Sequence, residues 1–249
     1  MRRILLSTAA VAAAMIAIGM SSARAGLLVE ESVGNSGFTT LCSAASGGSC
    51  AGSATTGGVA FTLTSGLSNS PGTATLADLL SDAVSITNNG TSPTPAMITL
   101  LIGDTGFTAP TAPPDSLTFE SAIGTTVVIA GSANTLSYIS CIDSGDGQNV
   151  CPGTNSTAAV TPEITTVGSS NESDSVTVNS LAGPYSVTEE LQIALSTGSD
   201  INYSASSRLD AVPEPGTIAI LGPLLIGIGL FASRKQNRHN ANRASVAAA

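Results

Sequence analysis

The chain has 249 residues and a formal net charge of −9 at pH 7. Of its 17 acidic residues, 16 lie between residues 26 and 211, where Arg208 is the single basic residue. Such a strongly acidic segment repels phosphate backbones, which excludes nucleic acid as a partner, and it repels anionic lipid headgroups as well.

Residues 1–25 have the organisation of a secretory signal peptide. Two arginines follow Met1, an apolar Ala-rich run extends to Gly19, and Ala23 and Ala25 supply the small residues of a signal-peptidase site. We predict cleavage after Ala25 and export by the general secretory pathway. An uncleaved N-terminal anchor is the alternative.

Residues 26–208 have the pattern of an all-β domain. Apolar and polar residues alternate around Phe61, Val176 and Ile193. This alternation is typical of β-strands with one buried face and one solvent-exposed face. Further strands are predicted at 27–33, 83–87, 96–102, 116–121, 125–130, 136–142 and 202–206, and a short helix at 74–83. Turns are predicted at 88–90, 113–115 and 145–147, where Asn, Pro, Asp and Gly cluster.

Many short strands without alternating helices indicate an antiparallel β-sandwich, either immunoglobulin-like or jelly-roll-like. Glu189 and Glu190 are adjacent in one predicted strand. Successive side chains of a strand point to opposite faces, so these two carboxyls cannot form an acid–base pair by themselves.

Four cysteines fall in the predicted exported domain: Cys42, Cys50, Cys141 and Cys151. The loops between near neighbours are rich in Gly and Ser or in turn residues, so we predict the local disulfides Cys42–Cys50 and Cys141–Cys151, although four cysteines permit three connectivities. Each would stabilise the fold by about 2–3 kcal/mol. Disulfides fit an oxidising compartment, and the spacing does not fit a metal site.

The predicted exported domain lacks the residue types of common catalytic centres. It contains no histidine and no lysine, so a general base for a Ser or Cys nucleophile is missing. Asp143 with Asp146, or Glu172 with Asp174, could form a carboxylate pair, but solvated loop carboxylates are the better interpretation. A calcium loop around Asp143 would lack the full ligand series. We predict no enzyme, no metal and no cofactor.

The C-terminal region combines three signals in order. The extended tetrapeptide Val212-Pro213-Glu214-Pro215 comes first, and the apolar segment 217–233 follows. As a helix, that segment would be about 25 Å long and could span a membrane. A basic stop cap ends it, formed by Arg234, Lys235 and Arg238. Because basic residues stay in the cytoplasm, we predict a polar cytoplasmic tail at 239–249 and a body on the outside.

The region 209–238 resembles the PEP-CTERM sorting signal in its Val-Pro-Glu-Pro motif, its Gly-containing apolar run and its basic cluster. This signal occurs on exported proteins of Gram-negative bacteria that make exopolysaccharide. The resemblance implies processing by the membrane protease-transpeptidase exosortase and a transient anchor in the inner membrane. It also implies that 184–193 is the last long core strand before the signal.

Three functions are compatible with these patterns. The first is a non-enzymatic surface or extracellular-matrix protein, anchored in the inner membrane as a precursor and then released to the cell surface or exterior. The second is a carbohydrate-binding or adhesion module that works with the secreted exopolysaccharide. The third is an extracellular hydrolase, which the missing residue types disfavour.

Overall fold

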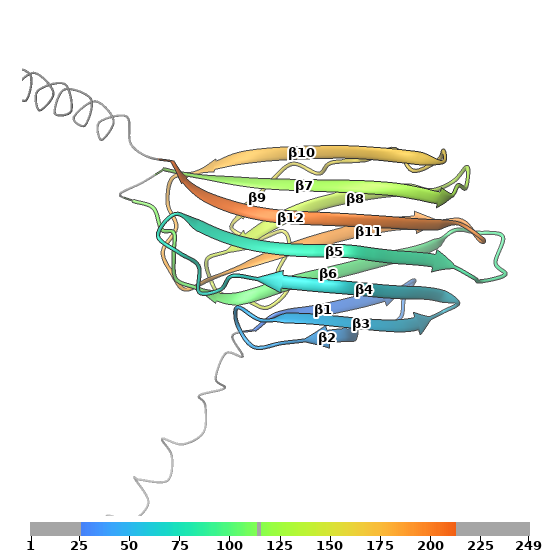
Figure 1. The fold of residues 1–249 in the computed structure, drawn as a ribbon, viewed down its shortest axis with the longest axis horizontal. Coiled ribbons are helices and arrows are strands. Elements are labelled where there is room, and N and C mark those ends of the chain that lie inside the picture. The colour runs from blue at the N-terminus through green and yellow to red at the C-terminus, as the bar shows by residue number, and fades with distance from the viewer. Residues whose placement is uncertain (1–25, 114–115, 213–249) are drawn as a thin grey trace, which may run out of the picture.

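The computed structural model describes residues 26–113 and 116–212, which form two six-stranded antiparallel sheets packed face to face (Figure 1). The predicted all-β sandwich is therefore confirmed, and the described residues contain no helix. In particular, no helix within residues 26–113 and 116–212 is long and apolar enough to cross a membrane. The predicted span at 217–233 lies outside the described residues.

Each sheet is a ladder of antiparallel neighbours. In spatial order, the first sheet contains β2 (Thr39–Ser43), β1 (Leu28–Val33), β6 (Ala96–Phe107), β11 (Tyr185–Leu195), β8 (Thr135–Asp143) and β9 (Asn155–Ser156). The second contains β10 (Gly168–Val178), β7 (Ser116–Ile129), β12 (Asp200–Val212), β5 (Leu76–Asn88), β4 (Val59–Ser68) and β3 (Ser49–Thr56). We call them the β6 sheet and the β5 sheet.

The described chain enters and leaves the sandwich at the same end (Figure 1). Leu28 starts β1 there, and Val212 ends β12 opposite Ser116. We call this the termini end. The opposite, loop end carries the connections 34–38, 57–58, 89–95, 130–134 and 196–199.

Period-two alternation places apolar side chains between the sheets. On β12, for example, Ile201, Tyr203 and Leu209 are at most 3% exposed, while Asn202, Ser204 and Arg208 are not buried. The rings of Phe107 and Tyr185 stack in the core with centroids 5.6 Å apart. Inward-facing residues of both sheets therefore share one apolar interior.

The prediction of a short helix at 74–83 is wrong, because residues 76–83 begin the central strand β5. Ala77, Leu79 and Ser81 are buried at every second position, and β5 pairs with β4 on one side and β12 on the other. Two complete ladders of hydrogen bonds outweigh the helix propensity of Ala and Leu. Ala83, at φ +49°, lies where the register with β12 shifts.

Three further differences concern strand number. The strands predicted at 116–121 and 125–130 are one continuous strand, β7. The strand predicted at 184–193 corresponds to β11 (Tyr185–Leu195), but β12 follows it, so β11 is not the last long core strand. Strands β2 and β3 were not predicted, because they are composed mainly of Ser, Thr, Ala and Gly and lack alternating large apolar residues.

Candidate functional site

The structure describes one residue of the predicted sorting motif. Val212 is the last residue of β12 and is 42% exposed. Pro213, Glu214 and Pro215 lie outside the described residues, as do the stop cap Arg234, Lys235 and Arg238 and the predicted signal-peptidase residues Ala23 and Ala25. The motif therefore starts at the last position of β12, and Pro213 follows that strand in the sequence without an intervening linker.

The predicted Cys42–Cys50 disulfide is confirmed, with its Cα atoms 5.9 Å apart. Cys42 lies on β2 and Cys50 on β3, which are edge strands of different sheets. The bond therefore joins the two sheets along one side of the sandwich. Its spacing in the sequence is that of a local loop, but its structural role is to connect the layers.

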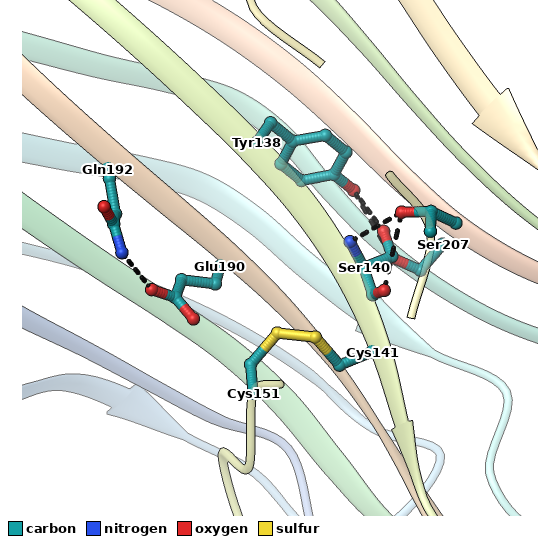
Figure 2. The surroundings of a disulfide bond; sticks show 8 residues. Tyr138, Ser140, Cys141, Cys151, Glu190, Gln192 and Ser207 are labelled. Atoms are coloured by element: carbon teal, nitrogen blue, oxygen red, sulfur yellow. Dashed lines mark hydrogen bonds between the residues drawn. A yellow bond between two sulfur atoms is a disulfide. The ribbon is translucent and has the colours of Figure 1, made fainter. Parts of the chain in front are cut away.

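The predicted Cys141–Cys151 disulfide is also confirmed and holds a loop against the β6 sheet (Figure 2). Within that loop, the Gln148 side-chain amide donates a hydrogen bond to the Gly103 carbonyl oxygen at 3.0 Å. The Asn149 amide donates one to Glu30 Oε2 at 2.8 Å. Residues 144–154 therefore cover part of the outer face of this sheet.

The carboxylates considered as a catalytic pair accept hydrogen bonds from the backbone. Asp143 Oδ2 accepts one from the Gly147 N–H at 2.9 Å. Asp146 Oδ1 does the same for Gly106 at 2.7 Å, and Asp174 Oδ2 for Ala158 at 2.7 Å. These contacts fix turns and a loop. Within residues 26–113 and 116–212, no three His, Cys, Asp or Glu side chains gather as they would around a metal ion.

A buried polar cluster crosses the middle of the core, and sequence analysis did not identify it. Glu189 on β11 accepts hydrogen bonds from Ser81 at 2.8 Å and Ser207 at 3.2 Å, both on the facing β5 sheet. Ser207 also lies 2.6 Å from Ser140, whose hydroxyl is 3.1 Å from the Tyr138 hydroxyl (Figure 2). Each of these five residues is at most 2% exposed. We call them the polar cluster.

Burial governs the charge of this cluster. Loss of hydration raises the pKa of the Glu189 carboxyl to about 8, and hydrogen bonds from Ser81, Ser207 and Tyr138 oppose the rise. Glu189 is therefore mainly protonated at neutral pH. The signal in the sequence was an acidic residue at an inward position, between Val187 and Leu191. Because the cluster is sealed between the sheets, it connects the layers and does not face a ligand.

On the surface of the described residues, two open hollows are candidate binding sites instead. The first, of about 570 Å³, lies on the outer face of the β5 sheet, where Ala122, Gly124, Ser204 and Ser206 are too small to fill the space. The Asn171 side chain of β10 lies above Gly124, with which Asn171 is paired. A Cβ atom added to Gly124 would be 2.7 Å from Asn171 Oδ1. Glu120 and Glu172 also line this hollow, which we call the sheet groove.

The second hollow, of about 590 Å³, lies at the loop end among the turns that follow β1, β3 and β5. Its walls are glycines, hydroxyl-bearing residues, the Asn88 amide and a few apolar side chains. No charged residue lines it in the described part of the chain. We call it the loop-end pocket. Both hollows fall in the size range of small-ligand sites.

No family model matches this sequence, and no curated protein matches it either. Among solved structures, an arabinose-bound α-L-arabinofuranosidase is similar over 52% of this chain and 19% of its own, at 12% identity and a TM-score of 0.32. The enzymatically active domain of bacteriophage CBA120 tailspike protein 4 is similar over 62% and 19%, at 11% identity and a TM-score of 0.29.

A cleaved adhesin domain of Lys-gingipain from Porphyromonas gingivalis is similar over 67% of this chain and 98% of its own, at 11% identity and a TM-score of 0.27. This chain thus spans about a fifth of the length of the first two proteins. The likenesses are too weak to support an argument about function.

Proposed function

We propose that this protein is an exported, non-enzymatic surface or extracellular-matrix protein, held in the inner membrane as a precursor and processed by exosortase at the Val212–Pro215 motif. The observation that carries the proposal is the path of β12. This strand pairs with β7 up to Val212, and Pro213 follows directly. A span at 217–233 would therefore place the termini end of the sandwich against the membrane.

The disulfides support an exported location. Cys42 is bonded to Cys50 and Cys141 to Cys151 in the folded domain, and the described residues contain no free cysteine. Such bonds persist in the periplasm and outside the cell, whereas the cytosol reduces them. An extracellular or periplasmic sandwich is consistent with both the predicted signal peptide and the predicted cytoplasmic stop cap.

The test is the C-terminus of the mature protein. We expect intact mass measurement to show a chain that ends within or near residues 212–215 in a strain with exosortase, and a full C-terminal tail in a strain without it. Replacing Pro213 and Pro215 by Ala should leave the tail in place in both strains. An identical C-terminus in the two strains would refute processing by exosortase.

A second candidate function is a carbohydrate-binding or adhesion module, as the sequence also allows. The observation that favours it is the pair of open hollows lined by hydroxyl and amide groups. Tyr138, Tyr185 and Tyr203 are at most 3% exposed, so none of them offers a stacking platform for a sugar ring. Binding would rely on hydroxyl, amide and backbone groups. Retention of the protein on a glycan array or on secreted exopolysaccharide is the test, and no retention would reject this function.

A further inference from the structure

The loop-end pocket owes its shape to glycines in neighbouring turns. Gly57 and Gly58 form the β3–β4 turn with positive φ angles of 57° and 84°. A Cβ at Gly58 would lie 2.9 Å from the Gly90 Cα, so a side chain there would force two turns apart. The Asn89 N–H donates a hydrogen bond to the Gly58 carbonyl oxygen at 2.9 Å and holds the turns together.

Internal hydrogen bonds hold the rest of the wall. Buried Asn88 donates from its amide to the Leu195 carbonyl oxygen at 2.7 Å and accepts from the Gly90 N–H at 2.9 Å. The Ser92 and Thr94 hydroxyls lie 2.8 Å apart, and Thr197 from the β11–β12 connection donates to the Ser92 carbonyl oxygen. A ligand would therefore meet preformed walls and would lose little affinity to ordering them.

The lining offers two kinds of contact. Thr91, Ser92 and Thr94 are exposed and carry hydroxyl groups, while Val33, Pro95 and Met97 present apolar surface. Met97 is 60% exposed, although it is a large apolar residue. Sugars need this combination, because each ring presents hydroxyls at its edge and C–H groups on its faces.

The loop end is also where exposed apolar residues gather. Phe38, Met97, Val128, Ile129 and Val167 lie at strand ends or in connections on this side, and they are five of the eight large apolar residues that are exposed within the described chain. The termini end lies on the far side of the sandwich (Figure 1). A tether at Val212 would therefore direct the pocket away from the membrane.

We propose that the loop-end pocket is a binding site for a neutral oligosaccharide. An anionic sugar would lose hydration in this pocket without forming an ion pair. No charged residue lines the pocket, and the described residues include a single basic one, Arg208. The sheet groove is the less suitable site, since Glu120 and Glu172 line it. This inference rests on the second candidate function above and identifies its site and ligand class.

The experiment is a binding titration of the full chain, purified in detergent, with neutral hexose oligosaccharides and with uronate-bearing oligosaccharides of equal length. We expect Thr94→Trp, which fills the loop-end pocket from an exposed position, to weaken binding of the neutral sugars at least tenfold. The matched control Ser204→Trp fills the sheet groove and should leave binding unchanged. Met97→Glu provides a second variant at an exposed rim position and should weaken binding as well.

The outcomes separate the site from the function. If neutral sugars bind but Ser204→Trp weakens them while Thr94→Trp and Met97→Glu do not, carbohydrate binding stands and the assignment to the loop-end pocket is overturned. Preference for uronate-bearing sugars would overturn the ligand class. If the unaltered protein retains no sugar of either kind, the second candidate function fails together with this inference. Unchanged thermal unfolding would show that the variants are folded.

Discussion

The middle of the sandwich core and the regions on either side of it are held together differently. Towards each end, Phe119 and Ile86 belong to an apolar interior whose stability depends on buried area. In the middle, Glu189 of the β6 sheet bonds directly to Ser81 and Ser207 of the β5 sheet. Apolar packing therefore drives the sheets together without direction, whereas the polar cluster fixes which residues face each other.

The largest expected effect tests the polar cluster through pH. The Glu189 pKa is about 8 in the fold, compared with an ordinary value of 4.5. Between these two values the unfolded chain releases a proton that the folded protein keeps, so rising pH favours unfolding. Full stabilisation from this group is present below about pH 4.5, and it is lost as pH rises to about 8.

Between these pH values the unaltered protein should lose up to about 5 kcal/mol of its free energy of unfolding, at about 1.4 kcal/mol per pH unit. We expect this pH-dependent loss to be absent in Glu189→Gln, because Gln does not titrate. Urea unfolding at a series of pH values measures the change. Glu190→Gln is the matched control, because Glu190 lies on the same strand and is not buried. A pH dependence of stability that is equal in the unaltered protein and in Glu189→Gln would refute the raised pKa.

The next effect tests the apolar part of the core. Phe119 on β7 is completely buried, so Phe119→Ala should lower the free energy of unfolding by about 3–5 kcal/mol at every pH. Chemical denaturation at two pH values checks both the size and the constancy of the loss. Phe38→Ala removes the same ring from a site that is 52% exposed and should change stability by less than about 0.5 kcal/mol.

The disulfide between the sheets tests whether the core alone keeps the layers aligned. Replacing Cys42 and Cys50 by Ser should lower the free energy of unfolding by about 2–3 kcal/mol, because the unfolded chain gains freedom. Hydrogen exchange should show the loss of protection in β2 and β3. The pair Cys141 and Cys151, replaced in the same way, should instead expose the loop 144–154. Equal exchange patterns in the two double variants would contradict their separate roles.

The smallest effect tests one hydroxyl group of the polar cluster, which lies within hydrogen-bond distance of Ser140, Ser207 and the Ser206 carbonyl oxygen. Tyr138→Phe removes a hydroxyl next to Ser140 and should lower the free energy of unfolding by about 1 kcal/mol. The control is Tyr185→Phe, because the buried Tyr185 hydroxyl has no hydrogen-bond partner among the described residues. That change should be neutral or slightly stabilising. Thermal unfolding of both variants would show whether the two tyrosines differ in this way.

Several features could be read from neighbouring residues. Alternation around Phe61 and Ile193 indicated strands with one buried face, and the turn residues between strands indicated an antiparallel sandwich. Cysteines close in the sequence indicated both disulfide pairs. Adjacency placed Glu189 and Glu190 on opposite faces of one strand, as the structure has them. These inferences succeed because strand geometry repeats every two residues. The sorting signal at 209–238 remains a prediction from sequence resemblance.

Other features depend on partners that are distant in the sequence. Residues 76–83 became a strand because β4 and β12 pair with them on both sides. Glu189 acquired its raised pKa because the facing sheet buries it. Its hydrogen-bond partner on that sheet, Ser81, is 108 residues away in the sequence, and this bond opposes the rise.

The sequence by itself therefore determined a disulfide-bonded all-β chain and the inward-facing residues of its clearly alternating strands. Only the tertiary structure decided what those residues meet, which sheets Cys42 and Cys50 join, and how the turns at Gly34, Gly58 and Gly90 enclose a pocket. The physical reason is that alternation and spacing act along the chain, whereas burial and hydrogen bonding depend on which strands pack face to face.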